Sequence, residues 1–480
     1  MKRRTTLLAG LLAAACVQAP AVQQRTLEIE PPERWSTTTG PGRDSQDPWW
    51  ILYGDTQLSE LIELGLAQND DLRAAAFRVK RAVAAGRIAK ADLKPSLGAG
   101  LSAQRQEQVF VGLPIPGGPN VLSSTSTQFA LSLETSWEAD LWGRLRAGAR
   151  AALAEAQATE ADLRGAQLSM SGQIAKLWFA VAEARQQLEL TRRSVESFTT
   201  STELVRSRYE SGVRPSIDLR LALSNQHNAE ALAAAAENAL DAALRQLETL
   251  LGRYPSAELL DRYSIDRLPD LPPPVPVGLP SELVSRRPDL VAAERRLTAA
   301  DQRVLVAQRS RYPRFAMTAR GGSVSDQLGD LLDGDFGVWA LVGNLTAPLF
   351  QAGRLKAGVE QARSAGDEAL ALYAGQVLRA YSEVETALAA EQHLRVREEK
   401  LRETAEQLEG AGALAATRYA RGVGDYLTVL ESQTRALNAR IAWIRVRREL
   451  LTNRVDLHLA LGGGFNTETV LAANEKERDS

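Results

Sequence analysis

The chain is poor in the residues that most enzymes and metalloproteins use for chemistry. Its 480 residues include one cysteine, Cys16, and three histidines, His227, His393 and His458. A single cysteine excludes an internal disulfide framework and a cysteine-based zinc site, and the histidines are too far apart for a zinc-protease motif. Aromatic residues make up 5% and the net charge is −2, so neither base stacking nor a basic nucleic-acid surface is expected. We therefore predict that the protein is not an enzyme, has no cofactor or metal, and has no nucleic-acid partner.

Long apolar runs are also absent. After residue 15 no run of about 18 apolar residues occurs, so we expect no transmembrane helix. The first residues, Lys2-Arg3-Arg4 and the apolar stretch 5–15, predict a signal peptide over 1–15. Cys16 follows small residues, which is typical of a bacterial lipoprotein signal, although Ala13 stands where leucine is usual. The prediction is a lipidated (palmitoylated) Cys16 that begins an extended segment, 16–55; an ordinary signal peptide is the alternative.

The chain contains an internal repeat. Three segments recur 210 residues later: Gly143-Arg144-Leu145 as Gly353-Arg354-Leu355, Arg208-Tyr209 as Arg418-Tyr419, and Leu251-Gly252 as Leu461-Gly462. Further upstream, Asp71-Leu72 recurs as Asp289-Leu290 at an offset of 218. These offsets predict two similar halves, 56–261 and 281–464, joined by a proline-rich linker over 262–280 and followed by a C-terminal tail, 465–480.

Each half carries the same order of predicted elements. A helix (56–92 and 281–310) precedes a pair of strands, at 95–111 and 126–142 in the first half and at 313–324 and 336–349 in the second. Apolar and polar residues alternate in the first three strands, whereas the fourth alternates poorly because Val338, Ala340 and Val342 lie on its other face. Long helices over 147–209 and 356–420 follow, and the first has apolar residues spaced by three and four, as in a coiled coil. The chain breaks after each long helix and returns as a helix over 214–252 or 424–461.

The strands are long enough to cross a membrane, and their polar faces carry Ser, Gln and Glu. A soluble sandwich with a buried apolar face is the alternative. Four strands cannot close a barrel that leaves no open edge in lipid, so an oligomer is required. Two chains would give eight strands and a filled interior, whereas three would give twelve and a lumen. The predicted fold is an α+β membrane protein: a trimeric 12-stranded β-barrel with four strands per chain, continued by a long coiled-coil helical barrel.

Several motifs extend over nearly the whole mature chain. They are Trp49-Trp50, Asn69-Asp70-Asp71-Leu72-Arg73, Trp137-Glu138-Ala139-Asp140-Leu141-Trp142-Gly143-Arg144, Leu279-Pro280-Ser281-Glu282-Leu283, Arg286-Arg287-Pro288-Asp289-Leu290 and Leu461-Gly462-Gly463-Gly464. On these motifs the sequence resembles the TolC-like outer-membrane factor family, and within it the OprM-type outer-membrane lipoproteins of RND efflux. The resemblance implies a homotrimer in the outer membrane of a Gram-negative bacterium, lipid-anchored and extending into the periplasm. It also implies two protein partners, a periplasmic adaptor (membrane fusion) protein and an inner-membrane RND-type proton-driven transporter.

The resemblance further implies a gate at the periplasmic helix tips. Family members carry a hydrophobic residue and then an acidic residue eight and twelve positions after a motif tyrosine; counted from Tyr419, these are Leu427 and Glu431. A latch in some members joins an aspartate to a tyrosine and an arginine, and here Asp218 and Tyr419 match while the arginine position falls on Gly424. The residues expected to contact the adaptor are the hairpin tips, Gly212, Val213, Gly422 and Val423. Plainer structural roles remain alternatives: a solvated helix charge for Glu431, a first-turn helix acid for Asp218 and packing for Tyr419.

The functional hypothesis is an exit duct of a tripartite pump that passes drugs or other small molecules from the periplasm to the exterior. A protein-export duct of the same fold is one alternative. A non-porous, lipid-tethered periplasmic coiled-coil scaffold is another, from a different class.

Overall fold

The computed structural model describes residues 32, 34–35, 48–111, 121–275 and 280–463. Cys16 and the tail 465–480 lie outside these residues. The chain divides into two compact units. The sheet unit includes Val79–Thr159 and Ala293–Leu372, and the hairpin unit includes Glu28–Arg78, Glu160–Ala292 and Tyr373–Ser480. We describe each unit by itself.

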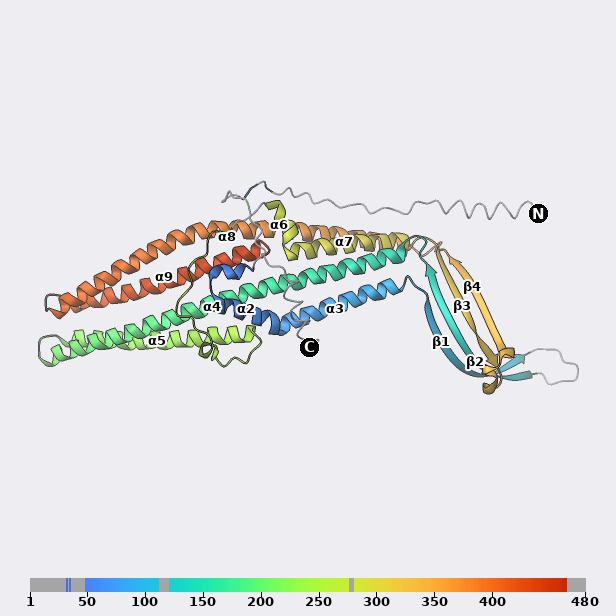
Figure 1. The fold of residues 1–480 in the computed structure, drawn as a ribbon, viewed down its shortest axis with the longest axis horizontal. Coiled ribbons are helices and arrows are strands. Elements are labelled where there is room, and N and C mark those ends of the chain that lie inside the picture. Colours follow the sequence, from blue (N-terminus) through green and yellow to red (C-terminus); the bar gives the residue numbers. More distant parts are fainter. Residues whose placement is uncertain (1–31, 33, 36–47, 112–120, 276–279, 464–480) are drawn as a thin grey trace. The chain divides into compact units, whose positions relative to one another are not determined.

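The sheet unit contains a four-stranded antiparallel sheet whose strands neighbour each other in chain order (Figure 1). They are β1 (Ser96–Val111), β2 (Val121–Ala139), β3 (Arg314–Ser325) and β4 (Gly337–Thr346). β2 ends at residue 139 rather than at 142, because the Asp140 carboxylate accepts hydrogen bonds from the amides of Leu145 (3.0 Å) and Arg146 (2.9 Å) and starts the next helix. β2 also begins at residue 121 rather than at 126, because its first residues continue the ladder with β1.

One face of the sheet is mostly apolar, and the other is mostly polar except on β4, where Val338 and Val342 lie on it. The register pairs Leu101 with Leu131 and Ala319 with Leu341 on the apolar face. These side chains are not packed within the chain: Leu101 is 67% exposed and Leu341 62%. A soluble sandwich would bury this face, so the exposed apolar face favours the membrane-spanning interpretation.

Two tryptophans fix the ends of the strands. Trp137 Nε1 donates a hydrogen bond to the carbonyl of Leu93 at 3.1 Å, and Trp142 Nε1 donates to that of Pro313 at 2.7 Å. The Trp142 ring also stacks on Tyr312, with the ring centroids 5.2 Å apart. The two indoles thus bond the end of β2 and the residues just after it to the segments that precede β1 and β3.

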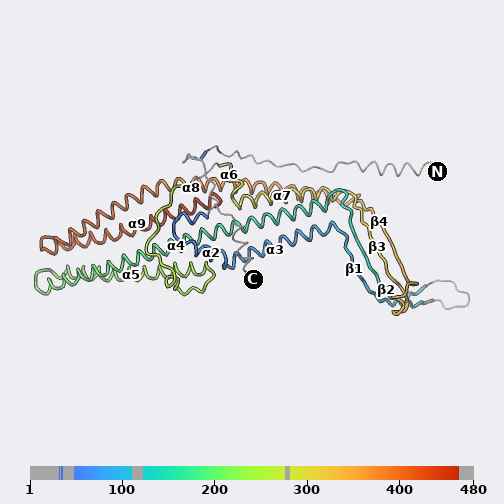
Figure 2. Tube along the Cα trace, viewed as in Figure 1, coloured from blue at the N-terminus to red at the C-terminus, as the bar shows by residue number. Residues whose placement is uncertain are grey.

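Three pairs of helices have equal lengths. α4 (Arg144–Glu210) and α8 (Arg354–Ala420) each contain 67 residues, α5 (Ser216–Leu250) and α9 (Tyr426–Ala460) each contain 35, and α3 (Asp70–Ala91) and α7 (Pro288–Arg309) each contain 22. In the hairpin unit α5 runs back beside α4, and α9 beside α8 (Figure 2). Helices related by the offsets of the sequence motifs therefore have matching lengths. None of the helices in the described ranges is both long and apolar enough to cross a membrane.

The helix expected before each strand pair is broken in two. α2 (Thr56–Gln68) stops before Asn69, whose side-chain oxygen accepts from the amide of Leu72 at 3.1 Å and so caps α3. In the second half α6 (Pro280–Arg286) is separated from α7 by Arg287, because Pro288 disfavours a helical conformation at the residue before it.

The expected seam of α4 faces inward. Ile174 and Val181 are fully buried and Leu188 is 7% exposed, while Leu177 and Val195 are half-buried. The apolar residues spaced by three and four along α4 therefore lie on its buried side.

A large apolar core lies in the hairpin unit and combines α2, α4, α5 and α9. It includes Leu58, Leu61, Ile62, Ile174, Trp178, Phe179, Val181, Leu247, Leu251, Leu451 and Val455. The segment 16–55, expected to be extended, contributes a 3-10 helix, η2 (Trp49–Tyr53), because its aromatic residues enter this core. Asp55 then caps α2 through the amides of Gln57 (2.9 Å) and Leu58 (3.0 Å) and accepts from Trp178 Nε1 at 2.8 Å.

Candidate functional site

The two helix hairpins end in turns of the same form. The amides of Gly212 and Val213 donate to carbonyls three and five residues earlier, both at 2.9 Å, and those of Gly422 and Val423 do so at 3.0 and 3.1 Å. This pattern ends a helix with a residue in the left-handed region, where Gly212 has φ 70° and Gly422 φ 81°. The glycines thus shape the tips, while Val213 and Val423 are 68% and 67% exposed.

Two arginines of the first tip hold the second tip. Arg208 donates to the carbonyls of Tyr419 (3.0 Å) and Ala420 (2.9 Å), and its guanidinium carbon lies 4.6 Å from the Tyr419 ring centroid. Arg214 donates to the carbonyl of Gly424 at 3.2 Å and lies 5.3 Å from the same centroid. We call Arg208 and Arg214 the arginine clamp. It combines charge-assisted hydrogen bonds to the end of α8 with cation–π contacts.

Beneath the clamp lies a small apolar cluster of Val205, Ala222, Tyr419, Tyr426 and Val429. The rings of Tyr419 and Tyr426 lie 5.4 Å apart. Burial raises the pKa of Tyr426 to about 12, and Tyr419 and the charge of Asp218 contribute in the same direction. Asp218 is thus an electrostatic neighbour of Tyr426. The buried Tyr419 hydroxyl has no hydrogen-bond partner within the described part of the chain, so Asp218 and Tyr419 form no such bond in one protomer.

The residues predicted to gate the tips lie one helical turn apart on α9. Leu427 is 49% exposed, and the Glu431 side chain is 55% exposed with Oε2 3.4 Å from Arg435 Nη2. Residues four apart share a helix face, so they present an apolar and an acidic group side by side. The exposed Glu431–Arg435 pair contributes little to stability. The gating role of these residues, the latch and the lipidation of Cys16 all stay predictions.

Sequence reasoning missed the clamp although the repeat pointed to it. At the offset of 210, Arg214 of the first tip corresponds to Gly424 of the second. The first hairpin thus carries an arginine, Arg214, at the position where the second hairpin carries a glycine, Gly424. A Cβ at Gly424 would lie 2.8 Å from the amide nitrogen of Tyr419, so this position has no room for a side chain.

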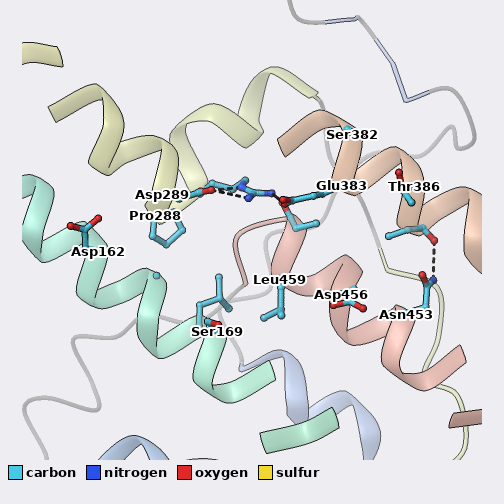
Figure 3. A pocket seen from close by; sticks show the side chains of 15 residues that line it. Asp162, Ser169, Pro288, Asp289, Ser382, Glu383, Thr386, Asn453, Asp456 and Leu459 are labelled. Carbon is cyan, nitrogen blue, oxygen red and sulfur yellow. Dashed lines mark hydrogen bonds and ion pairs between the residues drawn. The ribbon is translucent and has the colours of Figure 1, made fainter. Parts of the chain in front are cut away.

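A cavity of about 760 Å³, lined by both polar and apolar residues, lies elsewhere in the hairpin unit, between α4, α7, α8 and α9 (Figure 3). Arg287 on its wall donates to Asp289 (2.8 Å), to Glu383 (2.6 Å) and to the carbonyl of Ala460 (3.0 Å). Burial disfavours the charge on Asp289, but the Arg287 guanidinium outweighs it and holds the pKa of Asp289 below its usual value. The Arg287-Pro288-Asp289 motif thus joins the start of α7 to α8 and to the end of α9. Within the described residues no cluster of His, Cys, Asp and Glu is suited to a metal ion.

A buried histidine also lies in this unit. His458 is 7% exposed and stacks on Trp49, with the ring centroids 5.5 Å apart and an interplanar angle of 22°. Burial, helped by the charge of Arg454, lowers its pKa to about 4. Arg454 is itself fully buried, and it is paired with Glu391 and bonded to the carbonyl of Pro273 in the linker.

Comparison with known proteins matches this architecture to one family over most of the chain. The model of the outer membrane efflux protein family matches residues 61–253 and 279–463. Outer membrane protein OprJ of Pseudomonas aeruginosa is 31% identical over 466 residues, which cover 96% of each chain. The pyoverdine export outer membrane protein OpmQ of Pseudomonas putida is 32% identical over 458 residues, covering 92% of this chain and 94% of the relative.

Solved structures agree with this result. The outer-membrane channel OprN superposes with a TM-score of 0.83 at 27% identity, covering 93% of this chain and 99% of that one. The open state of the MtrE outer membrane channel of Neisseria gonorrhoeae gives a TM-score of 0.80 at 27% identity, covering 94% and 99%. The fold is thus that of the TolC-like channels, and the chain belongs to the outer membrane efflux protein family.

Proposed function

We propose that this protein is the outer-membrane exit duct of a tripartite efflux pump and passes small molecules from the periplasm to the exterior as a homotrimer. The observation that carries the proposal is the sheet, which has an uncovered apolar face, a polar face and two edge strands with one partner each. Open edges are not tolerated in lipid, and a closed 12-stranded barrel made by three chains would remove them. The apolar face would then contact lipid and the polar face would line a lumen.

The long helices would continue the duct into the periplasm. At about 1.5 Å per residue, 67 residues extend for about 100 Å. Six such helices and six return helices in a trimer would form a tube. The exposed tip valines, Val213 and Val423, would offer apolar contacts to a periplasmic adaptor, with Gly212 and Gly422 allowing close approach. An inner-membrane RND-type proton-driven transporter would supply the cargo.

The tips would form the periplasmic gate. Leu427 would narrow the pore with an apolar side chain, and Glu431 would place an acidic ring one turn away. The arginine clamp keeps the two hairpins of one protomer together, so opening would begin by loosening it. A latch that uses Asp218 and Tyr419 would act next to the clamp. Acylation of Cys16 would anchor the chain to the membrane.

Single-channel conductance in a planar bilayer tests the proposal. The purified chain is compared with an Arg208→Ala/Arg214→Ala variant, which removes the clamp, and with Arg421→Ala, an exposed arginine at the second tip, as control. We expect discrete conductance that is rare in the wild type. Because charge-assisted hydrogen bonds contribute about 1.5–3 kcal/mol each, removal of the clamp should raise the open probability about tenfold or more, and Arg421→Ala should leave it unchanged.

Assembly is checked on the same samples by heat-modifiable gel mobility. A trimer that stays silent in the wild type and in both variants would exclude the duct and would favour the non-porous scaffold. The other informative outcome is a wild type that conducts and a double variant with the same open probability. In that case the proposed duct would stand, but the clamp would not be part of the gate.

A further inference from the structure

The polar face of the sheet carries one ion pair between directly opposed residues. Glu134 of β2 and Arg320 of β3 are cross-strand partners, and Arg320 Nε lies 3.1 Å from Glu134 Oε1. Arg320 Nη2 also donates to the Ser132 hydroxyl at 3.4 Å, two residues along β2 on the same face. The side chains of Arg320 and Glu134 are 49% and 55% exposed. They therefore form a hydrated pair on the surface of the sheet.

The neighbours of this pair on the same row are small. Gly98 of β1 is opposite Glu134, and Ala340 of β4 is opposite Arg320. The pair is thus the only charge on its row of four residues, and no bulky side chain separates it from solvent. The next acid on this face of β2 is Glu138, and both of its oxygens accept from Arg144 at 2.9 Å. Each acidic residue of β2 is therefore matched by an arginine.

We propose that Glu134 and Arg320 form a charge-balanced ring in the barrel lumen, so that this level of the lumen does not select ions by sign. The proposal rests on the proposed function, because only a trimeric barrel turns the polar face into a lumen. Three copies of the pair would place three acids and three arginines at one level of the pore, where a ring of one sign would favour the opposite ion. A ring without net charge would add no preference for ions of either sign at its level of the lumen, so cargo of either charge would pass it.

A purely structural role is the other explanation for the pair. Cross-strand opposite charges stabilise a sheet by about 0.2–1 kcal/mol, and half-exposed pairs lie at the low end of this range. This role predicts a change in stability when either partner is neutralised and no change in ion selectivity. A measurement of selectivity therefore separates the two explanations.

The experiment measures the reversal potential of single channels in a KCl gradient. All variants carry Arg208→Ala/Arg214→Ala, so that the resistance of a closed tip does not dominate. Glu134→Gln leaves three unpaired arginines and should shift the permeability ratio toward chloride about twofold. Arg320→Gln leaves three unpaired carboxylates and should shift it toward potassium by a similar factor. The exchange variant Glu134→Arg/Arg320→Glu keeps the balance and should restore the original ratio.

Glu107→Gln is the matched control. It removes the same charge from β1 on the opposite, outward face, and should leave the reversal potential unchanged. Unchanged reversal potentials in Glu134→Gln and Arg320→Gln channels that conduct would overturn the inference and leave the duct intact. Absence of conductance in every assembled variant would instead overturn the proposed function, and the lumen ring with it.

Discussion

The sheet and the core of the hairpin unit use similar apolar residues in opposite ways. In the sheet, Leu97 is 75% and Trp339 83% exposed, whereas Trp178 and Phe179 in the hairpin unit are fully buried. The helices complete their core within one chain. The sheet leaves its apolar face uncovered in a single chain, which is what a lipid-facing barrel surface would need. One chain thus contains a region that is stable by its own packing and a region that we expect to become stable only in a membrane and an oligomer.

The largest expected effect comes from placing a charge on the uncovered face. Leu101→Arg on β1 should abolish assembly of the trimer in the membrane, because an arginine on the lipid face costs about 2–4 kcal/mol in each chain near the midplane. Ser102→Arg, one residue along on the polar face, is the matched control and should assemble normally. Heat-modifiable gel mobility of outer-membrane fractions measures both. Equal assembly of the two variants would mean that the apolar face does not contact lipid.

The second largest expected effect tests the apolar core of the hairpin unit, which is complete within one chain. Phe179→Ala should lower the free energy of unfolding by about 3–5 kcal/mol, because it leaves a cavity among fully buried side chains. Leu97→Ala on the exposed face of the sheet should lower it far less in detergent. Urea unfolding followed by far-UV circular dichroism measures both variants. A larger loss for Leu97→Ala would reverse the contrast between the two regions.

The element order followed from the sequence because it depends on local patterns. Alternation located the first three strands but was poor in the fourth, and the 210-residue offset related each half to the other. The contacts of the tips were harder to predict, because Arg208 and Tyr419 are 211 residues apart in the chain and meet only when both hairpins have formed. The breaks at Asn69 and Arg287 were missed although both have local signals, an Asn cap and a residue before proline. The burial of His458 against Trp49 likewise depends on η2, which no periodicity indicates.

The buried histidine gives the hairpin unit a pH dependence that the sheet should lack. Its pKa is about 4 when folded, against 6.5 as the ordinary value. Between these two values the unfolded chain binds a proton that the folded chain does not, so stability falls as the pH drops from 6.5 to 4. The total loss is about 3 kcal/mol at 1.36 kcal/mol per pKa unit. His458→Gln should remove this loss, and His393→Gln, at an exposed position on α8, should leave it. Urea midpoints across this pH range measure the slope, and equal slopes in the two variants would contradict the assignment.

The smallest expected effect concerns the tips, where an exposed helix face should behave as part of a pore. Glu431→Gln should reduce the preference for cations about twofold without changing trimer assembly, because it removes one acid per chain from the proposed gate. Arg435→Gln is a useful partner variant: it removes the cation 3.4 Å from Glu431 and should increase the preference instead. Reversal potentials in a salt gradient measure both. Opposite shifts would mean that this face of α9 lines the ion path, whereas no shift in either variant would mean that Glu431 is a solvated helix charge and that the gate lies at another level of the tips.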